Sequence, residues 1–281
     1  MIAGSPSSPP GYQEGQGTKA VFHWITAIFE EGQYYLVVDN RNHCLRNISM
    51  NDYSVQTYAG QCTFIGTANG NLEESAFNFP HGMARNGENE ILVTDKVGIR
   101  SIDRNTMTVF VLYRCCNPFP SSSRFYDLVI GDDNTVLLTI DHAIVKYSQN
   151  RMQILAGGQG KAQTCSSCPF KMAQLDNPRG LWILDKDIVL VAERGDRANR
   201  ITVLNRTDNS LSIVREILHK PRCITAVGNF IYIGVDEGIS KMAYTTSMYY
   251  IHVFRMGSEW PHAWLIVGFW ETFSSSDCTV R

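Results

Sequence analysis

The sequence predicts an all-β fold, a β-propeller of four-stranded antiparallel blades, with five recognisable repeat units and an incomplete or distorted sixth. The first observation is a short apolar strand pattern that recurs five times and ends at residues 39, 95, 140, 193 and 235. The second is that the intervals between these ends, 56, 45, 53 and 42 residues, suit a four-stranded unit with loops of varying length. The third is that a polar turn and further short strands follow each copy.

Length and composition exclude several other classes of protein. The chain has 281 residues, of which 44% are hydrophobic and 19% charged, so it can bury a substantial core. No apolar run reaches the roughly 18 residues that span a bilayer, so no membrane insertion is expected. The formal net charge of −2 lacks the cationic excess that is typical of nucleic-acid-binding proteins.

The strands of each repeat unit follow one another in a regular order. The recurring strand is followed by a second one, and in four units by a third, with hairpin turns rich in Asp, Asn and Thr between them. Each unit is therefore a small antiparallel meander. The recurring strands are expected at 35–39, 90–95, 135–140, 188–193 and 230–235, and the second strands at 44–48, 99–102, 144–147, 201–204 and 239–242.

A proline motif places another strand ahead of each recurring strand. Residues 77–83 (FNFPHGM) match residues 175–181 (LDNPRGL), and Pro221 fits the same frame. Because proline lacks the N–H that a ladder needs, it belongs at the first residue of a strand, here the innermost one. Upstream, Ala-Gly pairs at 59–60 and 156–157 close the preceding blades. The proline motif and the Ala-Gly pairs therefore predict the same boundaries between repeat units.

On these motifs the chain resembles the NHL-repeat family, whose members are six-bladed TolB-like β-propellers. The resemblance covers about residues 20–245 and is weakest in the third unit, which lacks both the proline and the aspartate of the pattern. It implies that five blades are completed to six, and residues 260–267 mimic the start of a sixth. We therefore expect a polar flexible leader at 1–19, an NHL-like propeller at 20–246, and a divergent tail at 247–281 that starts the sixth blade.

The eight cysteines and two sequons indicate an oxidising compartment. In a four-stranded blade, Cys44 and Cys62 fall in loops on the same face, so a bridge between them is expected. Cross-pairing between neighbouring blades is a second expectation, for Cys115, Cys116, Cys165 and Cys168. A redox or zinc half-site at residues 165–168 is the weaker alternative, since no second ligand pair stands at suitable spacing.

The same features predict where the protein resides. Asn47 and Asn205 begin the two glycosylation sequons, and together with the cysteines they favour an extracellular or cell-surface location. No secretory signal is visible in residues 1–17, which lack a cationic start and an apolar stretch. The expectation is therefore that the sequence is a fragment of a larger extracellular protein.

The residue that starts each innermost strand is expected at the mouth of the central channel, and none of these residues is aliphatic. They are the candidate ligand-binding residues: His23, His81, Tyr126, Arg179, Arg222 and His262. His23, His81 and His262 are potential zinc ligands. The pairs Pro80-His81 and Pro261-His262 are similar to the histidine motif of the peptidyl-amidating lyase propeller, and this similarity implies a zinc-dependent lyase as an alternative. Calcium, as in lactonase propellers, would find only Asp127 at these positions. The leading expectation is that the protein binds no cofactor.

The leading functional hypothesis is a non-enzymatic module that recognises a protein or small ligand on its loop-rich face. The first alternative is a zinc-dependent lyase or hydrolase that uses the histidine ring. The second is an RNA-binding NHL domain, although nucleic acid is not the expected partner. The arginines near the turns of the loop-rich face are Arg41, Arg46, Arg100, Arg194, Arg197 and Arg200, which are expected to form a solvated rim. The recurring carboxylates Asp39, Asp95 and Glu193 are expected to accept hydrogen bonds from the following turns.

Overall fold

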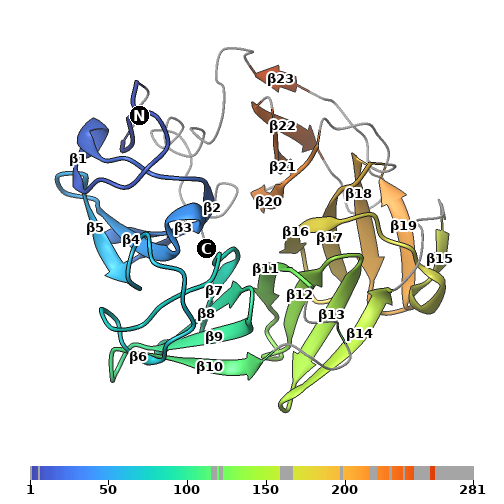
Figure 1. Ribbon diagram of the computed structural model, residues 1–281. Helices are drawn as coiled ribbons and strands as arrows, with labels where there is room; N and C mark the ends of the chain where they lie inside the picture. The colour runs from blue at the N-terminus through green and yellow to red at the C-terminus, as the bar shows by residue number, and fades with distance from the viewer. Residues whose placement is uncertain are drawn as a thin grey trace. The chain divides into compact units, whose positions relative to one another are not determined.

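The computed structural model describes residues 2–5, 7–114, 119, 123–158, 167–196, 199–214, 220–227, 230–236, 238–243 and 254–256. They form two compact units, the first ending at Phe125 and the second beginning at Tyr126. In the described part, the helical structure consists of three single 3₁₀ turns, and the rest of the regular structure is five antiparallel sheets (Figure 1). The predicted all-β fold with five propeller blades is confirmed.

Unit 1 contains the first two blades, and each sheet follows the predicted meander. The first sheet has the order β1-β5-β4-β3-β2 and the second the order β6-β10-β9-β8-β7. The strands of the first are β1 (Gly15–Gln16), β2 (Ile25–Glu31), β3 (Tyr34–Asp39), β4 (Cys44–Ser49) and β5 (Ser54–Ala59). Those of the second are β6 (Gly70–Asn71), β7 (Met83–Asn86), β8 (Glu90–Asp95), β9 (Gly98–Asp103) and β10 (Thr108–Arg114).

Unit 2 contains the other three blades. The third blade consists of β11 (Phe125–Ile130), β12 (Val136–Ile140), β13 (Ala143–Ser148) and β14 (Arg151–Gly157). The fourth consists of β15 (Ser167–Pro169), β16 (Pro178–Ile183), β17 (Ile188–Arg194), β18 (Asn199–Asn205) and β19 (Ser210–Val214). The fifth consists of β20 (Cys223–Val227), β21 (Phe230–Val235), β22 (Gly238–Ala243) and β23 (Phe254–Met256). The recurring sequence pattern corresponds to β3, β8, β12, β17 and β21, as predicted.

The core of each unit lies between neighbouring blades. In unit 1, Phe29, Leu36 and Val38 of the first blade pack with Ile91 and Val93 of the second. In unit 2, similar clusters join the third blade to the fourth and the fourth to the fifth. Every other residue of a strand faces one neighbouring blade, because side chains alternate along a strand. The first strands of neighbouring blades therefore come close together, as β2 and β7 do in unit 1 and β16 and β20 in unit 2.

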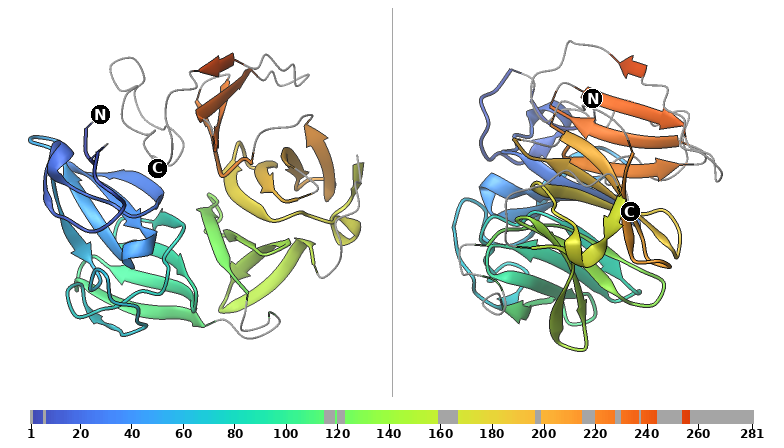
Figure 2. Two further views of the ribbon diagram at one scale, coloured as in Figure 1. Left: turned by 45° about the horizontal axis from the view of Figure 1, so that its top comes forward. Right: turned by 90° about the vertical axis from the view of Figure 1, so that its right-hand side faces the viewer.

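Three blades carry an extra outer strand that the four-stranded prediction did not include. The strands β1, β6 and β15 each pair with the last strand of their sheet. The C-terminal end of the leader expected at 1–19 therefore belongs to the first blade, where Gly15 pairs with Val55. Within the leader, the Gly4 N–H donates a hydrogen bond to the Gly17 carbonyl over 3.1 Å. The N-terminal segment, in dark blue, lies against the first blade in the left view of Figure 2. The N–H and C=O groups along the open edge of a sheet need hydrogen-bond partners, and the extra outer strands supply them.

The predicted start of a sixth blade at 260–267 lies outside the described residues. Of the tail predicted at 247–281, the structure describes only β23, which pairs with β22 and completes the fifth blade. No helix within the described ranges is long and apolar enough to cross a membrane.

Candidate functional site

The predicted mouth residues lie where each blade begins its first strand. His23 and His81 each stand two residues before a first strand, β2 and β7, and Arg222 directly precedes β20. Tyr126 and Arg179 are the second residues of β11 and β16. These five residues thus lie within two positions of the start of a first strand, and their place at the mouth of a channel stays a prediction. His262 lies outside the described residues.

In unit 1, backbone hydrogen bonds fix the positions of both histidines. The His23 backbone N–H donates to Asp39 Oδ1 over 2.8 Å, and the His81 N–H donates to the Thr94 carbonyl over 2.8 Å. Thr26 Oγ1 donates to the His81 carbonyl over 2.8 Å, which links the first blade to the second. These three bonds involve the main-chain groups of the two histidines, and both histidines are half-buried.

In unit 2, the predicted cationic residues have partners within the protein. The Arg179 guanidinium stacks on the Tyr126 ring at 3.6 Å from the ring centre. Arg222 Nε donates to Asp236 Oδ1 over 2.5 Å, and Arg194 Nη2 donates to Asp236 Oδ2 over 3.1 Å. Asp236 therefore neutralises part of the positive charge that the sequence suggested for anion recognition.

The zinc and calcium hypotheses both require several ligating side chains that lie close together. No three His, Cys, Asp or Glu side chains among the described residues are close enough to share a metal ion. Asp127 instead links two blades, because its Oδ2 accepts a hydrogen bond from the Leu181 N–H over 2.8 Å. The zinc hypothesis, which also requires His262, stays a prediction.

The recurring carboxylates each form a buried ion pair with an arginine. Asp39 pairs with Arg46 and Asp95 with Arg100, each at 3.3 Å with both side chains fully buried. Glu193 pairs with Arg200 at 2.8 Å. The carboxylates are structural, as predicted.

The expectation of a solvated rim was therefore wrong for three of the arginines. Arg46, Arg100 and Arg200 point inward, since each meets a carboxylate that the turn has already placed in the interior. Arg194 is paired with Asp236, Arg197 lies outside the described residues, and Arg41 is exposed as predicted.

Sequence reasoning missed a cluster of aromatic and cationic side chains in unit 1, which we call the Arg41 cluster: Trp24, Arg41, His43 and Phe79. The Arg41 guanidinium carbon lies 5.0 Å from the centre of the Trp24 ring and 5.8 Å from that of the Phe79 ring. The His43 and Phe79 rings meet edge to face at 4.3 Å. Trp24 is 39% exposed, and Arg41 is also exposed. The cluster joins the turn after β3 to the segment before β7.

Two of these aromatic residues have a left-handed backbone, which is unfavourable for bulky side chains. The φ angles are 70° at Trp24 and 50° at Phe79. Asn177 stands at the position equivalent to Phe79 in the fourth blade, directly before the proline, and has a φ of 53°. Asparagine tolerates this conformation well, whereas phenylalanine does not. A costly residue at such a position is a pointer to function.

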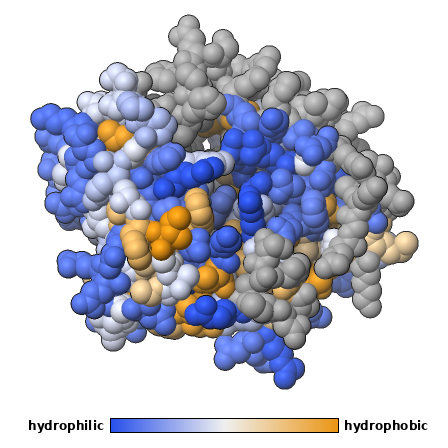
Figure 3. Space-filling view, in the orientation of Figure 1, coloured by the Kyte–Doolittle hydropathy of each residue, from blue (hydrophilic) through white to orange (hydrophobic). Residues whose placement is uncertain are grey.

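The loop between the first two blades adds apolar surface beside this cluster. The Cys44–Cys62 disulfide anchors it, and the Thr63 N–H donates to the Asn42 carbonyl over 2.7 Å. Phe64 and Ile65 follow and are 56% and 52% exposed. Apolar surface is visible over unit 1 in the region between its two blades (Figure 3). We call residues 62–65 the apolar loop.

The predicted cysteine pairing is confirmed for Cys44 and Cys62. Cys168 is also disulfide-bonded, whereas Cys115, Cys116 and Cys165 lie outside the described residues, so their pairing stays a prediction. Cys223 is a free, partly buried thiol. The sequon residues Asn47 and Asn205 are half-buried at β4 and at the end of β18, and their glycosylation stays a prediction.

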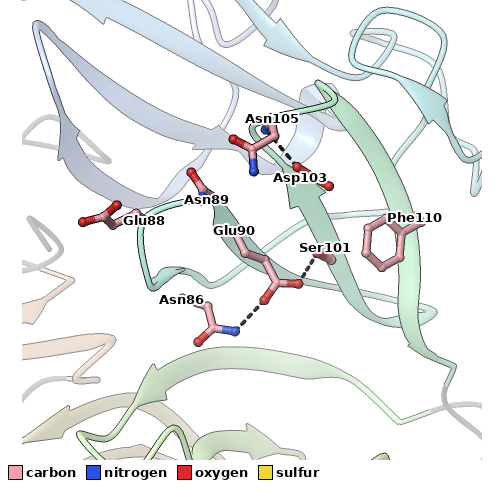
Figure 4. A pocket seen from close by; sticks show the side chains of 8 residues that line it. All are labelled: Asn86, Glu88, Asn89, Glu90, Ser101, Asp103, Asn105 and Phe110. Carbon is pink, nitrogen blue, oxygen red and sulfur yellow. Dashed lines mark hydrogen bonds between the residues drawn. The ribbon is translucent and has the colours of Figure 1, made fainter.

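A polar pocket of about 360 Å³ lies in unit 1, between the β7–β8 and β9–β10 turns (Figure 4). Its central carboxylate, Glu90, accepts hydrogen bonds from Asn86 Nδ2 and from the Ser101 hydroxyl. These turns are at the strand ends opposite to the Arg41 cluster, since β8 runs from Glu90 toward Asp95. The lining residues are Asn86, Glu88, Asn89, Glu90, Ser101, Asp103, Asn105 and Phe110.

His43 is expected to make the stability of unit 1 depend on pH. Its Nδ1 accepts a hydrogen bond from the Phe79 N–H over 3.2 Å, which requires an unprotonated Nδ1. Burial lowers the pKa of His43 below its ordinary 6.5, and the charges of Arg41 and His23 act in the same direction. A lowered folded-state pKa means that the unfolded chain binds the proton more readily. The stabilising contribution is therefore present above pH 6.5 and is lost as pH falls below that value.

We expect urea denaturation to show a larger loss of stability between pH 7.5 and 5.5 for the wild type than for His43→Asn. Asparagine suits the left-handed backbone of residue 43, whose φ is 59°. Equal pH dependence of the two proteins would contradict a neutral, structurally required His43. The same arrangement occurs in unit 2, where the Asn177 N–H donates to His142 Nδ1 over 3.3 Å.

Comparison with known proteins shows the fold. No family model and no curated protein matches this chain. A gluconolactonase from Xanthomonas campestris matches 86% of this chain with 84% of its own, at 13% identity and a TM-score of 0.58. A catalytically inactive virginiamycin B lyase from Staphylococcus aureus, solved with quinupristin, matches 82% with 69% of its own, at 14% identity and 0.55. A chain of a nidogen/laminin complex matches 83% with 80% of its own, at 16% identity and 0.59. All are β-propellers, and they include enzymes and a protein complex.

Proposed function

We propose that this chain is a non-enzymatic recognition module that binds a protein partner through unit 1. The observation that carries the proposal is the exposed Trp24–Arg41 pair together with the exposed side chains of the apolar loop, whose Thr63 backbone is bonded to Asn42, the residue after Arg41. Tryptophan and arginine are the residue types that most often dominate binding energy at protein interfaces. Trp24, Phe64 and Ile65 are each at least 39% exposed, although burying them in the core would be favourable. Exposed apolar surface of this kind is characteristic of interaction sites.

The loops that carry these side chains are held before a partner arrives. The disulfide ties the apolar loop to β4, and the buried Asp39–Arg46 pair fixes the end of β3 against β4. Asn40 Nδ2 donates to the Pro80 carbonyl over 2.7 Å, which joins the first blade's turn to the second blade. Loops fixed in this way lose less conformational entropy on binding, so more of the contact energy becomes affinity.

We further propose an extracellular or cell-surface location. The Cys44–Cys62 disulfide and the bonded Cys168 support it, because such bonds persist mainly in oxidising compartments. The NHL assignment belongs to the same proposal, and it is supported by the propeller fold and by the matching hydrogen bonds of Phe79 and Asn177, the residues directly before the prolines of the second and fourth blades.

A binding array of purified extracellular protein fragments tests the function. We expect the wild type to bind a partner and Phe64→Asp to weaken that binding at least tenfold, since a charge would be placed in an apolar contact. Met172→Asp is the matched control, because Met172 is 72% exposed and apolar but belongs to unit 2. Absence of any partner, or equal loss in both variants, would contradict the proposal.

Metal analysis of the purified protein tests the enzymatic alternative. The proposal expects no stoichiometric zinc in the wild type. Stoichiometric zinc that disappears in His81→Ala would instead favour the zinc-dependent lyase or hydrolase. His142→Ala is the matched control, since His142 is an exposed histidine that no metal hypothesis invokes.

A further inference from the structure

Charge is unevenly distributed over four segments of unit 1, residues 22–24, 39–43, 78–82 and 94–97, which we call the loop face. Its two carboxylates, Asp39 and Asp95, are fully buried and paired with Arg46 and Arg100. The loop face therefore exposes no carboxylate. Its basic side chains are His23, Arg41, His43, His81 and Lys96, of which Arg41 and Lys96 are exposed and permanently charged.

The four segments form one continuous surface. The Arg41 N–H donates to the His23 carbonyl over 2.9 Å, and the Lys96 N–H donates to the Asn78 carbonyl over 2.8 Å. Phe79 packs against His43 and lies under Arg41, and it directly follows Asn78 in the chain. The first blade therefore contributes the exposed Arg41 to this surface, and the second blade contributes the exposed Lys96.

The Arg41 guanidinium is prepared to bind an anion. Its planar group stacks on Trp24, and an arginine stacked in this way keeps its N–H donors at the edge of the plane. No carboxylate or carbonyl among the described residues accepts a hydrogen bond from this guanidinium. Arg85 and Arg194, by contrast, each meet a carboxylate at 2.5 Å and 3.1 Å. A carboxylate matches the geometry of the free donors.

The exposed apolar side chains of the neighbouring loop help to distinguish between an acidic protein segment and a dense polyanion as the ligand. Dense polyanions gain affinity by neutralising many phosphates or sulfates at once, which requires more fixed positive charges than Arg41 and Lys96 supply. Trp24, Phe64 and Ile65 would instead contact apolar side chains. We infer that the loop face binds an acidic protein segment in which aspartate or glutamate stands next to a large apolar residue, and that Arg41 binds the carboxylate. This inference rests on the proposed function.

Binding of two peptides of defined composition tests the inference that the loop face binds an acidic protein segment. The first probe is a fluorescent peptide in which Asp and Glu alternate with Leu, and the second has Asn and Gln in their place. We expect the acidic peptide to bind at least tenfold more tightly, with affinity falling as salt rises. Arg41→Gln should remove most of this preference, while Arg151→Gln, which changes an exposed arginine of unit 2, should leave it intact.

A second variant separates binding from folding. Phe79→Asn introduces the residue that the fourth blade carries at the equivalent position, with nearly the same φ, so the backbone is preserved. We expect a loss of affinity of about tenfold, because Arg41 loses one of its aromatic neighbours. The circular dichroism spectrum and the urea midpoint should show that the variant is folded.

Three outcomes would overturn the inference. The two peptides could bind equally, Arg41→Gln could bind the acidic peptide as the wild type does, or a heparin oligosaccharide or single-stranded RNA could bind more tightly than the acidic peptide. A protein partner that is lost in Phe64→Asp but is insensitive to Arg41→Gln and to salt would leave the proposed function standing and remove only the acidic partner.

Discussion

Removal of the Cys44–Cys62 disulfide is expected to lower the free energy of unfolding by about 3 kcal/mol. The bond joins residues 18 positions apart, and in the chain-entropy model a closed loop of this length restricts the unfolded chain by that amount. Cys44 is fully buried at the first residue of β4, so a polar substitute there would add a desolvation cost. The double variant Cys44→Ala, Cys62→Ala is therefore the cleaner test.

Urea denaturation of this variant and of the wild type measures the effect. Reduction with dithiothreitol alone does not isolate the bond, because Cys168 is also disulfide-bonded. Cys223→Ala is the control, since Cys223 is a free thiol, and it should shift the midpoint little. A double variant as stable as the wild type would show that the remaining contacts of the apolar loop already hold it in place.

Removal of one partner from a buried ion pair is expected to have an effect at least as large. Arg100→Val leaves the Asp95 carboxylate fully buried without its countercharge, and such changes typically cost about 3–5 kcal/mol. Arg100 also donates to the carbonyls of Ala76 and Ala68, each over 2.8 Å, so two further acceptors lose their donor. The free energy of unfolding should fall accordingly in urea denaturation.

The third blade provides a matched control for this experiment. It has Ile140 where the second blade has Asp95, and Val145 pairs with Leu138 as Arg100 pairs with Val93. The double variant Asp95→Ile, Arg100→Val copies this apolar arrangement. We expect it to be more stable than Arg100→Val alone, because no buried charge is left unpaired. A double variant that is equally or less stable would show that the lost backbone hydrogen bonds, rather than the unpaired carboxylate, cause the damage.

The candidate site was only partly visible in the sequence. The proline motif brought Arg179 and Arg222 within one residue of the start of a first strand and His81 within two, because proline acts locally through its missing N–H. The Arg41 cluster was missed, because Trp24 and Phe79 come from different blades and neither belongs to the aligned mouth positions. Two signals were available: an arginine in the turn after the first recurring strand, and a phenylalanine where the fourth blade has asparagine.

Five repeat units, the order of the four main strands in each and one disulfide could be predicted from the amino-acid sequence alone. These features depend on alternation within a strand, on turn chemistry and on spacing along the chain, all of which are local. Which charged side chains face inward became clear only from the folded arrangement of the strands and turns. Arg41 and Arg46 are five positions apart, yet one is exposed beside two aromatic rings and the other is fully buried with Asp39. Burial depends on side chains that distant segments bring into contact, and no local pattern specifies them.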